Sequence, residues 1–254
     1  MAHPFEVQDE ITVDASPEDI WQAITSGPHL DSWFIGHSTV EPRLGGTVRM
    51  DFGGGAISDS TITAWQPGQH FASSGPTAPD GSTMAFEFVI EARGSGRTSI
   101  RLVHSGFLPD DNWEAEYDAL KKGDPAYLHT LGEYVTHFRN RTALANLFAV
   151  GPKAASGAHV WSTLTERLGL HEPVSVGTAV RATLAGLAPI DGVVDYRTPD
   201  FLGIRTRDGL IRLIHGHDGS VVAEHHIFTP EIANRENSEA WQAWLTDALA
   251  VPTT

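Results

Sequence analysis

The sequence predicts an α+β fold in which a curved antiparallel sheet wraps around one long helix, followed by a second, shortened copy of the same architecture. Three observations lead to this prediction. Residues 123–150 have the periodicity of a long amphipathic helix, and a run of short strand patterns precedes them. The inner face of an antiparallel sheet is the natural partner for the apolar side of such a helix. Finally, residues 151–254 repeat features of the first 150 residues in the same order.

The elements of the first copy begin with a strand and two helices. Phe5 to Val13 alternates partially, which is typical of a strand. Ser16-Pro17-Glu18-Asp19 supplies a hydroxyl cap, a first-turn proline and two acids for a helix that ends near Gly27. A short helix is expected at 29–34. The strand patterns that follow are Thr47–Phe52, Ile57–Trp65, His70–Ser74, Thr83–Glu91 and Thr98–Ser105.

The long helix predicted at residues 123–150 has one apolar side. At 100° per residue, an arc of about 100° holds Tyr127, Leu131, Tyr134, Val135 and Phe138. The opposite side carries His129, Glu133, His137 and Asn140. We expect the apolar side to close a cavity against the sheet. We expect this opposite side to be solvated or to pack on the second domain. A metal site is not expected there, because ligands four residues apart would be spread over about 12 Å of helix.

Three segments with sequence patterns similar to those of the first copy, and a closing helix, indicate the second copy. Residues 160–165 repeat the pattern of residues 20–25, residues 192–204 that of residues 60–72, and residues 225–228 the spacing of residues 104–107. The closing helix is expected at 234–250. We therefore expect domains at 1–150 and 151–254. No first strand is evident in the second copy, since the residues before Trp161 are assigned to the long helix and Gly151-Pro152.

Composition narrows the class of protein. The 254 residues contain 32 acidic and 17 basic side chains, giving a formal net charge of −15, and no cysteine. Such a charge repels phosphate backbones and anionic membranes, so neither nucleic acid nor membrane is expected as a partner. No stretch of about 20 apolar residues occurs, and no basic segment followed by an apolar run opens the chain. A cytoplasmic protein is expected.

Several segments of the chain resemble a known family. They are ITVDASPEDIWQAIT (11–25), Trp33-Phe34, GGTVRM (45–50) and RLVHSGF (101–107). These resemble the START-like (SRPBCC) helix-grip superfamily and are most similar to homologues of the heat-shock-protein ATPase activator (Aha-type), over about residues 5–148. The resemblance implies a helix-grip fold that holds an apolar ligand between sheet and long helix. It also implies a chaperone as a possible partner, or an enzyme of the cyclase or hydrolase type.

His104 is the most informative single residue. Strand alternation places it on the same face as Ile100 and Leu102, toward the expected cavity. There it could orient a ligand carbonyl or act as an acid or base, because a histidine pKa is easily moved near neutrality. The alternative is a structural histidine whose hydrogen bonds are satisfied within the protein. His225 and His226 alternate across a strand, so they cannot easily chelate one metal.

The candidate ligand-binding residues are mostly aromatic and form either a solid core or the lining of a pocket. The tyrosine hydroxyls and His104 would fix the orientation of a ligand. No catalytic residue, metal site or cofactor is predicted, since the chain has no phosphate-binding loop, Gly-x-Ser-x-Gly elbow or HExxH pattern. The candidates are Trp33, Phe34, Phe52, Trp65, Phe86, Phe88, Leu102, His104, Tyr127, Leu131, Tyr134 and Phe138.

Overall fold

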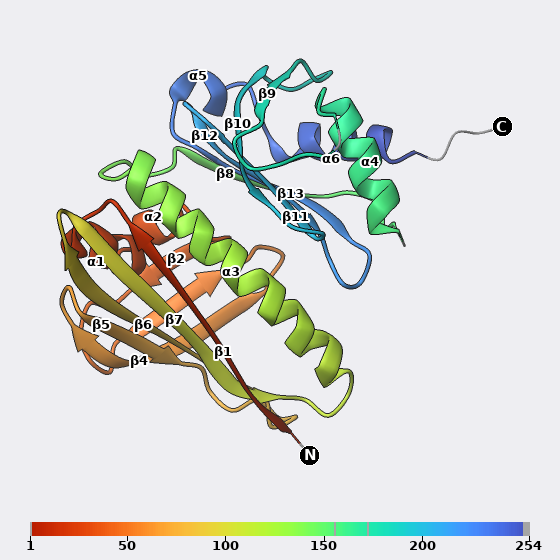
Figure 1. Cartoon of the computed structure of the whole chain (residues 1–254). Helices are drawn as coiled ribbons and strands as arrows, with labels where there is room; N and C mark the ends of the chain where they lie inside the picture. The colour runs from red at the N-terminus through yellow and green to blue at the C-terminus, as the bar shows by residue number, and fades with distance from the viewer. Residues whose placement is uncertain (1, 155, 172, 251–254) are drawn as a thin grey trace. The chain divides into compact units, whose positions relative to one another are not determined.

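The computed structural model describes residues 2–154, 156–171 and 173–250. The chain divides into two compact units, residues 1–142 and residues 143–254. Each unit combines one antiparallel sheet with helices (Figure 1). Among the described residues, no helix has both the length and the apolar composition needed to span a bilayer. The units are described separately below.

The first unit contains a seven-stranded sheet in the order β1-β7-β6-β5-β4-β3-β2. Its first and last strands are neighbours, paired from His3↔Leu108 to Val13↔Thr98. The strands are β1 (His3–Val13), β2 (His37–Val40), β3 (Thr47–Asp51), β4 (Ile57–Gln66), β5 (His70–Ser74), β6 (Thr83–Gly94) and β7 (Arg97–Leu108). The helices are α1 (Pro17–Thr25), α2 (Gly27–Leu30) and α3 (Trp113–His137).

Local sequence explains how α1 begins. The Ser16 hydroxyl accepts a hydrogen bond from the Asp19 amide, and the Asp19 carboxylate accepts one from the Ser16 amide, which together form a capping box. Pro17 occupies the first turn, where its missing N–H is not needed. Ile20 and Ile24 then bury one side of the helix, and α1 packs against β6. This element agrees with the prediction from the sequence.

Helix α3 lies along β1 and β7 (Figure 1). Its apolar side is buried as predicted, at Leu131, Tyr134, Val135 and Phe138. The predicted limits, 123 and 150, are wrong. The helix already begins at Trp113 and continues through Pro125, and it ends at His137. Two residues after the Phe138 cap, Asn140 has φ +62°, a left-handed conformation that cannot continue a right-handed helix.

The second unit contains a six-stranded sheet in the order β8-β13-β12-β11-β10-β9. Its strands are β8 (Ala145–Val150), β9 (Ala179–Ala182), β10 (Ile190–Arg197), β11 (Phe201–Thr206), β12 (Gly209–His215) and β13 (Val221–Ile227). Its helices are α4 (Gly157–Arg167), α5 (Pro230–Ala233) and α6 (Ser238–Ala248). Helix α6 packs on β8, β13 and α4.

The two units have the same architecture. In each, the first strand pairs with the last, and the closing long helix packs on that pair. The predicted α+β fold with a second, shortened copy is therefore confirmed, and the second sheet has one strand fewer. The expectation that the second copy lacks a first strand is wrong. Residues 145–150, assigned from sequence to the long helix, form β8 and pair with β13 from Ala145↔Ile227 to Val150↔Val222.

Candidate ligand sites

The His104 ring lies among aromatic side chains in the first unit. On β7, His104 stands opposite Val7 of β1 and Phe86 of β6. Its ring is stacked on Phe86, with ring centroids 4.0 Å apart and planes inclined by 23°. The ring of Phe5 meets it edge-on at 5.2 Å. Only 2% of His104 is exposed. The inward direction expected from strand alternation agrees with this burial.

One nitrogen of His104 is paired and the other is not. The Nδ1 atom lies 3.0 Å from Oδ2 and 3.3 Å from Oδ1 of Asp124, a largely buried residue of α3. The Nε2 atom is buried and has no hydrogen-bond partner within the described part of the chain. Because an ionised carboxylate only accepts hydrogen bonds, we assign the Nδ1 proton to this contact. In the neutral ring, Nε2 is then an acceptor.

Asp124 was missed in the sequence, although a signal for it was present. At 100° per residue it lies about 40° from Leu128, inside the apolar stripe of α3. An acid in that position faces the sheet. A second acid, Asp9, shares the inner face of β1 with Val7 and is partly buried. Burial, helped by the charge of Asp124, raises the pKa of Asp9.

Several of the predicted aromatic residues form clusters that are separate from the contacts around His104. Phe34 meets Tyr127 of α3 at 4.8 Å between centroids, and it also contacts Trp33. Trp65 belongs to a cluster with Trp21 and Phe71, and Phe71 continues this cluster to Phe88. The other candidates are the buried Leu102 and Leu131 and the 40% exposed Phe52, which follows β3.

Two of the predicted residues have hydrogen-bond partners within the protein, and a third is buried. The Trp33 Nε1–H donates to the Ala23 carbonyl at 3.0 Å. The Tyr134 hydroxyl lies 2.5 Å from His29 Nδ1 and donates to the Arg141 carbonyl at 2.7 Å. Burial raises the pKa of Tyr134 to about 12, so the phenol stays protonated at neutral pH. Phe138 is buried at the cap of α3. The Tyr134 hydroxyl thus connects α2 to the segment after α3, and its expected role in orienting a ligand stays a prediction.

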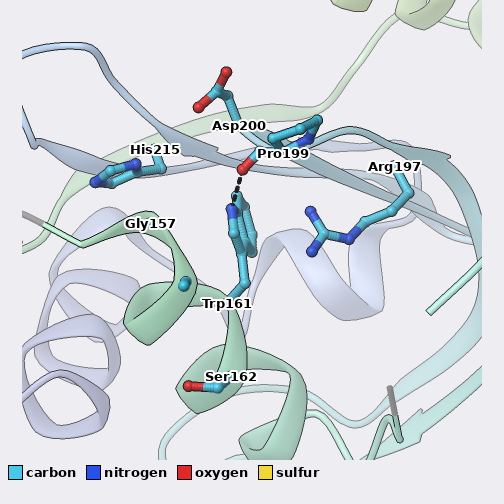
Figure 2. Close-up of a pocket in the computed structure, with 8 residues that line it drawn as sticks. Gly157, Trp161, Ser162, Arg197, Pro199, Asp200 and His215 are labelled. Carbon is cyan, nitrogen blue, oxygen red and sulfur yellow. Dashed lines mark hydrogen bonds between the residues drawn. The ribbon is translucent and has the colours of Figure 1, made fainter. Parts of the chain in front are cut away.

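A pocket of about 540 Å³ lies in the second unit, around Trp161 of α4 (Figure 2). Figure 2 shows the indole standing between His215 and Arg197, with its nitrogen directed at Pro199. The indole N–H donates to the Pro199 carbonyl. The Arg197 guanidinium lies 4.7 Å from the centroid of the ring, a cation–π contact. Asp200 also lines the pocket.

Several polar groups around Trp161 contact backbone carbonyls of the protein. The Arg197 guanidinium donates to the Thr198 carbonyl, and His215 Nε2 lies 2.8 Å from the Ala154 carbonyl oxygen. The bond from the Trp161 indole fastens the turn between β10 and β11 to α4, and the His215 contact ties the end of β12 to the segment before α4. We interpret this pocket as a structural junction. From the sequence, Trp161 is identified only as the residue that corresponds to Trp21 in the repeated helix pattern.

His129, Glu133 and His137 follow one another at four-residue spacing along α3. Across residues 2–154, 156–171 and 173–250, no group of three or more His, Cys, Asp or Glu side chains could hold a metal ion. His129 and His137 lie 3.9 and 3.6 Å from the carboxylate of Glu133, as the four-residue spacing along α3 suggests. These three side chains therefore form a row of polar contacts along the helix.

The fold and the matching sequence define the class of protein. The first unit is a START-like helix-grip domain, since its sheet wraps the long helix α3 along β1 and β7. Residues 14–136, which lie in the first unit, match the family described as Activator of Hsp90 ATPase homolog 1-like protein. This family is the one that the sequence segments resemble. No curated protein matches the chain.

Solved structures similar to this chain include proteins that cover about half of it and one that covers nearly all of it. The Aha1 dimer from Colwellia psychrerythraea shares 21% identity over 52% of this chain and 96% of that chain, with a TM-score of 0.43. A protein from Mesorhizobium loti shares 22% identity over 51% and 95%, with a TM-score of 0.45. The di-domain ARO/CYC BexL from the BE-7585A biosynthetic pathway shares 15% identity over 98% and 100%, with a TM-score of 0.47.

Proposed function

We propose that the first unit binds a hydrophobic or aromatic small molecule between its sheet and α3, with His104 as the polar contact. The observation that carries the proposal is the buried Nε2 atom without a hydrogen-bond partner in the described part of the chain. An unsatisfied buried polar atom costs about 1–3 kcal/mol. A ligand that supplies the missing hydrogen bond removes this cost, which favours the bound state.

The surroundings of His104 favour a mostly apolar ligand. Phe5, Phe86 and Leu102 offer apolar surface near the ring, as ligand pockets usually do. With its proton on Nδ1 toward Asp124, a neutral His104 accepts a hydrogen bond at Nε2 from a hydroxyl or N–H group. A protonated ring would instead donate to a carbonyl oxygen. The expected ligand is therefore a mostly apolar molecule with one polar group.

Thermal-shift and native mass-spectrometric screens of the full chain against aromatic and lipid-like compounds test this proposal. At least one compound should stabilise the protein saturably, and His104→Gln should weaken its binding by at least tenfold. His70→Gln is the matched control, because His70 also pairs with a carboxylate, Glu87, at 2.8 Å, but is partly exposed. The proposal is wrong if no compound binds saturably or if His104→Gln binds as tightly as the parent.

The same geometry favours an enzyme as a second candidate function. In an acid–base enzyme, a carboxylate commonly orients the histidine through one nitrogen and leaves the other for the substrate. Asp124 and His104 have this relation. In that case His104 would take or give a proton in a cyclase- or hydrolase-type reaction. His104→Gln should then abolish turnover of a bound compound while the protein stays folded, and retained turnover would refute the acid–base role.

The family name also suggests a chaperone partner, which for this chain is a separate proposal. Capture by a ninety-kilodalton heat-shock chaperone in a pull-down would support it. Substitutions at the surface of the first unit should then abolish capture, whereas His104→Gln in the interior should not. Absence of capture at any concentration of the chaperone would contradict this function without affecting the ligand-binding proposal.

A further inference from the structure

We propose that the second unit holds a ligand site of its own, built on His225 and Glu236, which binds a small, neutral, largely apolar molecule through a hydroxyl group. His225 lies on β13, the last strand of its sheet, and Glu236 lies between α5 and α6. The site is distinct from the Trp161 pocket and from the interior of the first unit.

The two side chains form a buried pair. His225 is 5% exposed and Glu236 6%. The Nδ1 atom of His225 lies 2.7 Å from Oε2 of Glu236. The ring of Trp241 on α6 meets the His225 ring edge-on, with centroids 5.8 Å apart. The imidazole is thus fixed in orientation by a hydrogen bond and by an aromatic neighbour, as a binding or reacting group requires.

Glu236 is held by three donors. Besides His225, the Trp241 Nε1–H donates to Oε2 at 2.9 Å, and the Ala188 amide donates to Oε1 at 3.0 Å. Burial alone would raise the pKa of Glu236, but these hydrogen bonds and the charge of His225 outweigh it and lower the pKa below its usual value. An ionised Glu236 only accepts, so the His225 proton belongs on Nδ1.

The pair lines a pocket of about 300 Å³. Apolar side chains form part of its wall, including Ile190 at the start of β10, Ile211 of β12 and Ile232 of α5. Arg207 and Asp208, at the β11–β12 turn, also line the pocket and lie 3.4 Å apart. Asp191 also lines the pocket and pairs with Arg181 at 3.7 Å, so each charged side chain of this lining has a partner within the protein, which favours a neutral ligand.

The Nε2 atom of His225 is the polar group left for a ligand. It makes no hydrogen bond with the described residues, in contrast to Nδ1. Gly209 lies against this nitrogen, and a Cβ at that position would come within 2.8 Å of Nε2. A side chain at this position would therefore collide with the imidazole. With the proton on Nδ1, Nε2 accepts a hydrogen bond, and a hydroxyl group is the matching donor.

Two matched probes test this site in the full chain. 2-Naphthol carries the proposed hydroxyl, and 2-fluoronaphthalene has a similar shape but no donor. Binding is followed through the imidazole ¹⁵N signals of His225, assigned by their loss in His225→Gln. We expect 2-naphthol to shift the Nε2 signal saturably and to bind at least tenfold more tightly than 2-fluoronaphthalene. His104→Gln should leave this response unchanged, so failure of the first-unit proposal is distinguishable.

A second variant keeps the test decisive if His225→Gln does not fold. Ile232→Trp on α5 should fill the pocket without touching the hydrogen bonds of Glu236, and it should weaken 2-naphthol binding at least tenfold while the His225 signals remain. The proposal is overturned if saturating 2-naphthol leaves the His225 signals unchanged, if both probes bind equally, or if Ile232→Trp binds as tightly as the parent.

Discussion

Each unit places a histidine of its last strand next to a carboxylate associated with its closing helix, but the carboxylates are held differently. Asp124 belongs to α3 itself, and the hydrogen bond seen at its carboxylate in the described structure comes from His104. Glu236 precedes α6 and accepts from His225, Trp241 and a backbone amide. One architecture can therefore keep a buried imidazole in place through a single contact or through a network.

The first helices of the two units show how local sequence repeats as local structure. Thr25 donates to the Trp21 carbonyl and Thr165 to the Trp161 carbonyl, each at 2.6 Å. The indoles then diverge. Trp21 packs on Trp65 at 4.9 Å, whereas Trp161 donates to a backbone carbonyl and lies under Arg197. Helices with similar sequences therefore make different contacts with the rest of their units.

Removing the carboxylates should give the largest difference between the units. Glu236→Ala leaves three donors without their acceptor and should lower the free energy of unfolding of the second unit by about 3–5 kcal/mol. Asp124→Ala leaves only His104 unpaired and should cost the first unit about 1–3 kcal/mol. Native-state hydrogen exchange of β13 and β7 amides measures the two losses separately. Equal losses would contradict the distinction between network and single contact.

Replacing both members of the pair in the first unit should recover most of the stability lost on replacing one. His104→Leu alone strands a buried carboxylate, and we expect a loss of about 2–4 kcal/mol. Adding Asp124→Leu removes the stranded charge, so the double variant should regain about 2 kcal/mol. Urea unfolding of the parent, both single variants and the double variant gives this coupling. Additive losses would show that the two side chains do not act as a pair.

Replacing Trp161 or Trp21 should destabilise the two units to different extents. Trp161→Phe loses the hydrogen bond to Pro199 and weakens the contact with Arg197, so it should destabilise the second unit by about 1–2 kcal/mol. Trp21→Phe keeps an aromatic ring against Trp65 and should cost the first unit less than about 1 kcal/mol. Hydrogen exchange of α1 and α4 amides tests this order, and a reversed order would contradict the structural reading of the Trp161 pocket.

Titration gives the smallest predicted difference, with opposite signs in the two units. The pKa of Asp9 is raised, so its favourable contribution is present at low pH and is lost as the pH rises through the folded-state pKa. Asp9→Asn should therefore stabilise the first unit at pH 7 by less than about 1 kcal/mol, since the carboxyl is partly solvated. The gain should vanish near pH 3. Urea unfolding across this range measures it, and a loss of stability at pH 7 would contradict the assignment.

Glu236 should change the stability of the second unit with pH in the opposite direction to Asp9 in the first unit. Its pKa is lowered, so its contribution is present at neutral pH and is lost as the pH falls through the folded-state pKa. Glu236→Gln should consequently cost the second unit more at pH 7 than near pH 3. If both substitutions changed stability in the same direction as the pH rises, the proposed environments of the two carboxyls would be wrong.

The sequence predicted the elements whose signals are local. The cap of α1 at Ser16 and the apolar stripe of α3 were both read correctly, because hydrogen bonding and periodicity act within a few residues. Residues 145–150 were misassigned because Leu147 and Ala149 continue an apolar pattern that only pairing with β13 turns into a strand. The end of α3 lies at the Phe138 cap, which leaves the helical conformation two residues before Asn140 and its positive φ, and neither residue type requires a helix to stop there.

The polar part of each candidate site was harder to predict. His104 was singled out because strand alternation places it inward, and the structure buries it there. Its partner Asp124 and the pair of His225 and Glu236 depend on contacts across 20 and 11 positions of sequence. A sequence pattern can mark an acid inside an apolar stripe, as at Asp124, but Glu236 lies outside any helix or strand, so no periodicity marks it.

The imidazole ¹⁵N spectrum of the ligand-free full chain at pH 8 tests the central claim most directly. Our account predicts that His104 and His225 both carry the proton on Nδ1, with Nε2 unprotonated and available to a ligand. Signals assigned through His104→Gln and His225→Gln would report each ring. Protons found on Nε2 with Nδ1 bare would contradict the pairing with Asp124 and Glu236, and with it the proposed use of both histidines.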